Sequence, residues 1–180
     1  MIVVLTEQLA LAGTLVHADI AEIGRRGYQT LIDLRTDREP AAGGLSPAEV
    51  RQHATALGLA YCQIPVSVPA LNDATVETVR RALREAEGPV LLHCVSGRRA
   101  GALALMHLGC EEGASVEQCF AKAQVIGLDW DSLPGLREFC IEYISRHLSS
   151  QRRVTVRCSG CRCVTSARYY RHRRNHHCDS

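Results

Sequence analysis

The residues Pro89-Val90-Leu91-Leu92-His93-Cys94-Val95-Ser96-Gly97-Arg98-Arg99-Ala100-Gly101-Ala102 decide how this chain folds. The apolar run 89–92 is typical of a buried strand, and the small and apolar residues 100–108 are typical of a helix. A cysteine therefore lies where a strand ends and a loop turns into a helix N-terminus. Unpaired backbone N–H groups and the helix dipole make such a place favourable for an anion or a thiolate.

The residues after Cys94 favour a reactive thiol over a structural one. A cysteine at a strand end often serves only as a small buried hydrophobe. Here Gly97 allows the loop to bend, and Arg98 and Arg99 add positive charge that stabilises a thiolate. We therefore expect Cys94 to be a solvent-accessible nucleophile and Arg99 to clamp an anion with its guanidinium.

The other loop residues are expected to help bind the same anion. Val95, Ser96 and Gly97 would contribute backbone N–H groups. His93 would orient the loop by hydrogen bonding. Arg98 has two interpretations, either a substrate contact or a solvated cation that only adds to the positive field.

Strands and helices alternate along the first 148 residues. We predict strands at 2–5, 9–12, 30–34, 60–66 and 89–93, and helices at 17–26, 47–57, 74–87, 100–109, 115–125 and 132–147. This alternation predicts an α/β fold with a mainly parallel central sheet flanked by helices. Ligands of such sheets bind beyond the carboxyl ends of the strands, which is where Cys94 falls.

Two charged sites on these elements have simple structural interpretations. Asp33 and Arg35 come at the carboxyl end of another strand, where they would form an ion pair or line the same cleft as Cys94. In the helix 74–87 the apolar residues share one face, so Arg80 is predicted to face water.

The cysteine loop also resembles a known signature. His93-Cys94-x-x-Gly97 followed by arginine resembles the loop of cysteine-dependent tyrosine and dual-specificity phosphatases. Only four residues separate Cys94 from Arg99, one fewer than in those phosphatases, and this shorter loop resembles that of rhodanese-type sulfurtransferases. From Leu9 to His147 the chain is similar to a bacterial family that combines both features, the phosphatase-like domain noted beside β-lactamase-like hydrolases; the supporting segments are 31–35, 57–61 and 64–66.

The resemblance implies a dual-specificity-phosphatase-like fold and a cysteine-dependent hydrolase. Cys94 would attack a phosphomonoester on a small molecule or a phosphoprotein and form a phospho-cysteine, while Arg99 holds the phosphate oxygens. In those phosphatases an aspartate after the Ile-Pro-Val-like strand protonates the leaving group. Asp73 is the only acid on the corresponding stretch 67–73, and it has helix capping as its alternative role.

Two other functions remain open from the sequence. The short loop suits a sulfurtransferase, which needs no leaving-group acid and would carry sulfur as a Cys94 persulfide between a sulfur donor and a thiol acceptor. A catalytically inactive module would use the same loop, together with the basic tail, only to bind phosphorylated or polyanionic partners.

The last residues form a segment of different character from the α/β domain of residues 1–148. The first 150 residues hold 13 Lys and Arg against 18 Asp and Glu, whereas the last 30 hold 8 Arg and 1 Asp. We expect the tail, residues 149–180, to be flexible and to contact polyanions. No cofactor is expected, with the exception of zinc in the tail, because Cys158, Cys161, His172 and His176 have the outline of a zinc site with a shorter span than usual.

Composition limits the cellular context. The chain has 180 residues, of which 46% are hydrophobic and 4% aromatic, so one aliphatic core is expected. It contains no apolar run of the length that a membrane span needs, and its first residues lack a basic segment typical of a signal peptide. We therefore expect a cytoplasmic protein without a membrane partner, in which the nine cysteines are reduced thiols or metal ligands.

Overall fold

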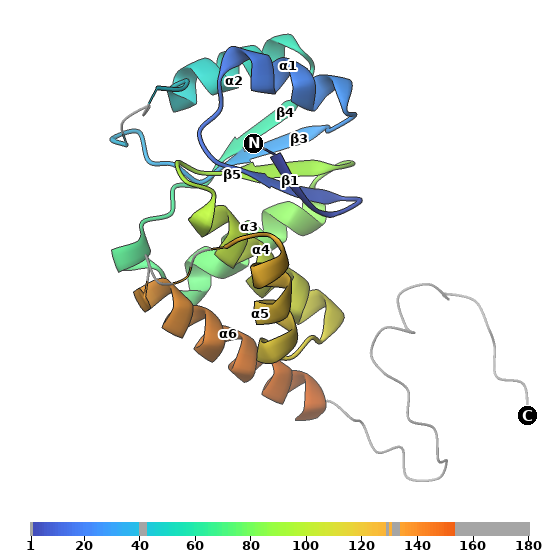
Figure 1. Ribbon diagram of the computed structural model, residues 1–180, viewed down its shortest axis with the longest axis vertical. Coiled ribbons are helices and arrows are strands. Elements are labelled where there is room, and N and C mark those ends of the chain that lie inside the picture. The colour runs from blue at the N-terminus through green and yellow to red at the C-terminus, as the bar shows by residue number, and fades with distance from the viewer. Residues whose placement is uncertain (1, 40–42, 129, 131–133, 154–180) are drawn as a thin grey trace, which may run out of the picture.

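The computed structural model describes residues 2–39, 43–128, 130 and 134–153, and within this part of the chain a five-stranded sheet forms the centre (Figure 1). The strand order is β1-β2-β5-β3-β4, and all neighbours are parallel apart from the antiparallel pair β1 and β2. The predicted mainly parallel sheet is confirmed. The strands are β1 (Ile2–Thr6), β2 (Leu9–Ala12), β3 (Thr30–Asp33), β4 (Ala60–Gln63) and β5 (Val90–His93).

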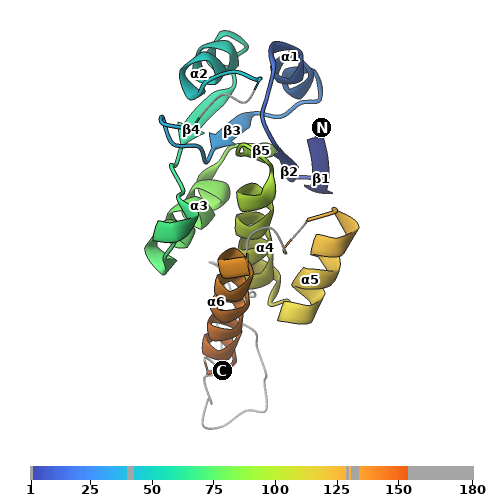
Figure 2. The same ribbon diagram turned by 60° about the vertical axis from the view of Figure 1, so that its left-hand side comes forward.

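Helices cover both faces of the sheet. Figures 1 and 2 show α1 and α2 on one face and α3, α4, α5 and α6 on the other. Two clusters of buried side chains lie between these layers and the sheet, one under each set of helices. The helices are α1 (His17–Arg25), α2 (Pro47–Ala56), α3 (Asp73–Glu85), α4 (Arg98–Glu112), α5 (Val116–Val125) and α6 (Pro134–Arg153), with a short 3-10 turn at Val68–Ala70.

The central strand β5 has no polar face because it is covered on both sides. All four of its residues are buried, and it pairs in parallel with β2 on one side and with β3 on the other. The sequence of a strand that is buried on both faces is a continuous apolar run rather than an alternation of apolar and polar residues. The loop that follows His93 therefore starts from a buried strand that is hydrogen-bonded on both sides.

Local capping signals set where several helices begin. Ser46 and Ser115 each accept a hydrogen bond from the backbone N–H three residues later, and Glu49 and Gln118 return a bond to the cap, as in a capping box. Asn72 caps α3 by accepting from the Thr75 N–H at 3.0 Å. Asp73 is therefore the first residue of the helix, and Asn72 rather than Asp73 is its cap.

Several boundaries and one orientation differ from the expectations; the larger differences lie at β4, α4 and α6, and α4 also ends at Glu112 rather than at residue 109. β4 ends at Gln63 rather than at residue 66, although the Ile64 and Val66 N–H groups still donate to the Asp33 and Leu34 carbonyls at 2.9 and 3.0 Å. α4 starts two residues before Ala100, and α6 continues to Arg153. The prediction that Arg80 faces water is wrong: its side chain is buried, and its Nη1 donates to the Tyr143 hydroxyl of α6 at 3.1 Å.

Membrane-spanning helices and clusters of metal ligands were both sought among the described residues. None of the described helices combines the length and the apolar content needed to cross a bilayer. Within the same residues no three His, Cys, Asp or Glu side chains gather as metal ligands. The zinc candidates Cys158, Cys161, His172 and His176 lie outside the described residues, as does the tail beyond Arg153.

Candidate active site

Cys94 lies at the carboxyl end of β5, directly before the N-terminus of α4. Gly97 caps this helix with a left-handed backbone, φ +81°, which glycine adopts without strain. The bend points the Gly97 N–H at the Cys94 Sγ, at a distance of 3.2 Å. The sulfur is thus held by a backbone amide at the positive end of a helix, the arrangement expected from the sequence.

The expectation that the Cys94 thiol is open to solvent is wrong for this conformation. Cys94 is 0% exposed and contributes to the core between the sheet and α4. The loop closes around the sulfur because the Gly97 N–H folds back onto it and the side chain of Arg99 lies beside it. Ser96, by contrast, is exposed at the surface of the loop.

Residues 12–14, at the end of β2 and directly after it, hold the Cys94 loop by hydrogen bonds. The Cys94 N–H donates to the Ala12 carbonyl at 3.3 Å. Thr14 donates twice to the Val95 carbonyl, from its backbone N–H at 2.8 Å and from its hydroxyl at 2.9 Å. Gly13 lies so close to the loop that a Cβ added to it would be 3.0 Å from the Val95 carbonyl oxygen. Residues 12–14 therefore fix the loop backbone, a role that the sequence did not reveal.

Arg99 reaches from the first turn of α4 across the ends of the neighbouring strands. Its Nη1 donates to the Val66 carbonyl at 2.6 Å and to the Leu34 carbonyl at 3.3 Å. Both terminal nitrogens also bind the carboxylate of Glu39, with Nη1 2.9 Å from Oε1 and Nη2 bonded to Oε2. Burial opposes the charge of Arg99, but Glu39 and the nearby Cys94 sulfur outweigh it and raise the pKa of the guanidinium.

Glu39 is a site residue that sequence reasoning missed. It lies in the polar loop between β3 and α2, where no periodicity marks a functional position. The Thr36 N–H donates to its Oε1 at 2.8 Å. Burial would raise the pKa of Glu39, yet the hydrogen bonds from Arg99 and Thr36 lower it, so this carboxylate is ionised at neutral pH.

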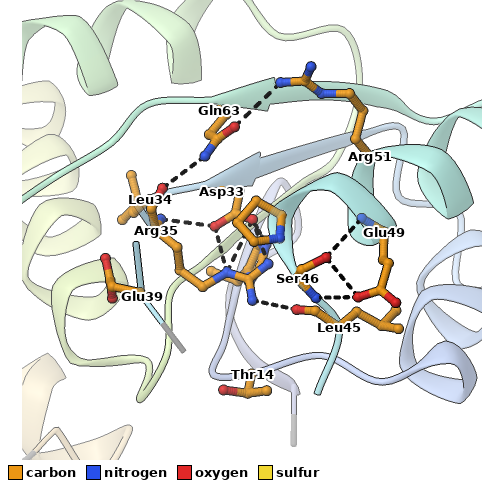
Figure 3. A network of polar contacts seen from close by, with 12 residues as sticks. Thr14, Asp33, Leu34, Arg35, Glu39, Leu45, Ser46, Glu49, Arg51 and Gln63 are labelled. Atoms are coloured by element: carbon orange, nitrogen blue, oxygen red, sulfur yellow. Dashed lines mark hydrogen bonds and ion pairs between the residues drawn. The ribbon is translucent and has the colours of Figure 1, made fainter. Parts of the chain in front are cut away.

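Asp33, Arg35 and His93 form a buried polar network next to the loop, and Figure 3 shows the two charged residues with their partners. Asp33 and Arg35 are 0% and 1% exposed at their side chains, and Arg35 Nη2 lies 2.7 Å from Asp33 Oδ2. Arg35 also donates to the Leu45 carbonyl at 2.6 Å, and the Tyr61 hydroxyl donates to Asp33 at 3.2 Å. The structural ion pair is confirmed, and it ties β3 to the start of α2.

This network also positions His93. Its Nε2 lies 3.3 Å from Asp33 Oδ2, and its side chain is 0% exposed. Burial opposes ionisation of Asp33, but the interactions with His93 and Arg35 lower its pKa well below the usual range. Neither ring nitrogen of His93 has a hydrogen-bond partner among the described residues, so its predicted role of orienting the loop by hydrogen bonding stays a prediction. The buried ring does not reach the surface where a substrate would enter.

Asp73 lies apart from the loop in this conformation. Its two carboxylate oxygens accept from the Arg146 guanidinium of α6 at 2.8 and 2.9 Å, on the exposed side of α3. Among the described residues no hydrogen bond or ion pair joins Asp73 to residues 93–99. Its role as a general acid stays a prediction, and its observed contacts join two helices.

The fold and the Cys94 loop together define the structural class of this chain. A parallel sheet with a buried cysteine and an arginine at the start of the helix after its central strand belongs to the dual-specificity-phosphatase-like α/β folds. Residues 2–110 match the family described as "Beta-lactamase hydrolase-like protein, phosphatase-like domain". Because this match covers more than half of the 180 residues, the chain belongs to that family.

Two curated relatives carry the family's name. The chain is 35% identical over 97 residues to the beta-lactamase hydrolase-like protein of Agrobacterium fabrum, which covers 53% of this chain and 22% of that protein. It is 37% identical over 99 residues to the protein of the same description from Xylella fastidiosa, covering 55% and 23%. The match therefore spans less than a quarter of the length of these relatives.

Solved structures of phosphatases share the fold. A protein of Neisseria meningitidis, described as a candidate phosphatase, is 28% identical with a TM-score of 0.67, and the match covers 78% of this chain and 96% of that one. TpbA of P. aeruginosa, solved in complex with pTyr, is 20% identical with a TM-score of 0.64, covering 80% and 87%. Human DUSP28 is also 20% identical, with a TM-score of 0.61 and coverage of 83% and 97%. The two more distant likenesses establish the fold, and the family match makes the chain phosphatase-like.

Proposed function

We propose that the chain hydrolyses phosphomonoesters with Cys94 as the nucleophile and Arg99 as the phosphate clamp. The observation that carries the proposal is the Cys94 Sγ accepting the Gly97 N–H at 3.2 Å, with the Arg99 guanidinium beside it. A thiolate is the nucleophilic form of cysteine, and an amide and a guanidinium both stabilise it. The same donors would hold the equatorial oxygens of a transferring phosphoryl group.

The reaction would proceed in two displacements. The Cys94 thiolate attacks phosphorus and forms an S–P bond while the bond to the ester oxygen breaks, and that oxygen takes a proton from water or from Asp73. Water then attacks the phospho-cysteine, releasing phosphate and restoring the thiolate. Substrates proposed on this basis are a phosphorylated small molecule or a phosphoprotein, and the arginine-rich tail would add contacts to polyanions.

Sulfur transfer is the second candidate, and one observation favours it. Only four residues separate Cys94 from Arg99, and the single acid on the stretch 67–73, Asp73, is engaged by Arg146. A sulfurtransferase needs no leaving-group acid, because the thiolate takes a sulfane sulfur from a donor and passes it to a thiol acceptor.

Side-by-side assays of an aryl phosphate and of thiosulfate with cyanide test the proposal. We expect phosphate release by the wild-type chain and its loss in Cys94→Ser, with thermal unfolding showing that the variant still folds. Cys62→Ser is the matched control, since Cys62 is an exposed thiol on β4. Thiocyanate formation without phosphate release would replace the proposal with sulfur transfer. Phosphate release that survives Cys94→Ser would remove Cys94 as the nucleophile.

A further inference from the structure

A cavity of about 260 Å³ lies against the first half of the Cys94 loop. Ser96, Gly97 and Arg98 form its wall on the side of the loop, and Gly13 joins them from the end of β2. The cavity and the candidate anion site thus share the loop backbone between Ser96 and Arg98. A ligand held at the N–H groups of this loop would have the cavity directly beside it.

The rest of the cavity wall is aliphatic. Val3 of β1 and Leu11 of β2 line it on the sheet side, and Ile126 and Leu128 line it on the side of the segment after α5. Among the lining residues that the structure describes, none is acidic or aromatic, and Arg98 carries the one charge. Such a lining favours an uncharged hydrocarbon body and accepts negative charge only at the end near the loop.

The shape of this cavity is held by close backbone and side-chain packing. Leu128 lies so near the first turns of α4 that a Cβ added at Gly101 would be 2.9 Å from its Cδ1. On the other side, a Cβ added at Gly97 would be 3.7 Å from the Ala12 carbonyl oxygen. Both contacts lie at glycines flanking the start of α4, so the cavity is formed by the same packing that orients the loop.

We propose that this cavity receives the apolar body of an anionic ligand whose phosphate or phosphonate group sits on the Cys94 loop. The inference rests on the proposed function, and it names the substrate class: a phosphomonoester with a short aliphatic leaving group. The volume is smaller than the sites that enclose drug-sized ligands, about 300–1,000 Å³, so a chain of a few carbons fits it better than an extended peptide.

Binding of non-hydrolysable alkylphosphonates to the wild-type chain tests this inference. We expect hexylphosphonate to bind about tenfold more tightly than ethylphosphonate by calorimetry, since burying only part of the four extra methylenes suffices for that factor. Val3→Phe fills the cavity and should remove this preference while leaving ethylphosphonate binding unchanged. Val4→Phe is the matched control, because Val4 does not line the cavity and is 58% exposed. It should keep the tenfold preference.

Equal affinity for the two phosphonates, or a preference that survives Val3→Phe, would overturn the inference. Should Val3→Phe unfold, Ile126→Trp blocks the same cavity from the opposite wall and carries the same expectation.

The outcomes separate this inference from the proposed function. Chain-length preference without hydrolysis of an aryl phosphate would overturn only the catalytic proposal. Hydrolysis of the aryl phosphate without any chain-length preference would overturn only the inference about the cavity.

Discussion

Arg99 and Glu39 face each other in a two-pronged ion pair, although 60 positions separate them in the chain. Each terminal nitrogen of the guanidinium meets one carboxylate oxygen, and the carbonyls of Leu34 and Val66 hold Nη1 from the sheet side. A guanidinium fixed in this way cannot rotate freely about its own axis. The orientation of Arg99 toward the Cys94 sulfur therefore depends on a loop from a different part of the sequence.

Glu39→Gln should weaken catalysis more than folding. The amide keeps one acceptor for Arg99 but loses the charge, and a charge-assisted hydrogen bond contributes about 1.5–3 kcal/mol, so kcat/KM for an aryl phosphate should fall about tenfold or more. Glu49→Gln is the control, because Glu49 is exposed in the first turn of α2 and its carboxylate binds the cap residue Ser46. The control should leave kcat/KM unchanged. Higher activity in Glu39→Gln would mean that Glu39 competes with the substrate instead of orienting Arg99.

Asp33→Asn should destabilise the whole domain. The substitution leaves Arg35 charged and buried without its partner, and breaking a buried pair in this way costs about 3–5 kcal/mol. Chemical unfolding at pH 7 measures the loss. Asp73→Asn is the matched control, since both side chains of the Asp73–Arg146 pair are exposed. This variant should lose far less free energy of unfolding than Asp33→Asn. Equal effects of the two variants would contradict a structural role of the buried pair.

The same ion pair predicts how stability depends on pH. The pKa of Asp33 is lowered by folding from an ordinary value of 3.8, so the unfolded chain takes up the proton first as the pH falls. The stabilisation from Asp33 is complete above about pH 5 and is lost progressively below it. The difference in unfolding free energy between wild type and Asp33→Asn should therefore shrink from pH 5 to pH 3. A difference that stays constant over this range would show that Asp33 titrates alike in both states.

Local signals were enough to predict the scaffold of the site. The apolar run before Cys94 predicted β5, and the serines of the two capping boxes, Ser46 and Ser115, predicted where α2 and α5 begin. These signals act over only a few residues of chain, so they can be read without knowing the fold. Gly97 belongs to the same group, because its place before a helix predicted a bend that the structure confirms.

The residues that complete the site could not be predicted because their partners come from distant segments. Glu39 meets Arg99 only once the loop after β3 and the start of α4 are placed side by side. Arg80 has the pattern of a surface residue, yet its guanidinium is buried, where it pairs with Glu77 of α3 and Glu111 of α4 and donates to the Tyr143 hydroxyl of α6. The enclosure of Cys94 likewise depends on Arg99 and on the support of residues 12–14.

Gly13→Ala should impair the loop more than the fold. The new Cβ would lie 3.0 Å from the Val95 oxygen, a backbone atom, so the loop must shift by a few tenths of an ångström. Small misplacements of catalytic groups can cost about 100-fold in rate, and we expect kcat/KM to fall by at least tenfold. Gly135→Ala is the control, because a Cβ there meets nothing within 4 Å. Unchanged kcat/KM in Gly13→Ala would show that residues 12–14 do not set the loop geometry.

Asp73→Asn tests whether this carboxylate is the general acid or only joins α3 to α6 through Arg146. A general acid matters most for a poor leaving group, so its loss would slow an alkyl phosphate far more than an aryl phosphate with a stable leaving phenolate. Since both oxygens of Asp73 accept from Arg146, we expect both substrates to be hydrolysed within about a factor of two of the wild-type rate, with an unchanged pH–rate profile. A selective loss on the alkyl phosphate, together with loss of the basic limb of the profile, would instead make Asp73 the acid and require its pair with Arg146 to open during turnover. Arg146→Gln distinguishes these two roles, because it frees the Asp73 carboxylate. The variant should leave the rate of alkyl phosphate hydrolysis unchanged if Asp73 only joins α3 to α6. It should raise that rate if Asp73 must be released from Arg146 to act as the acid.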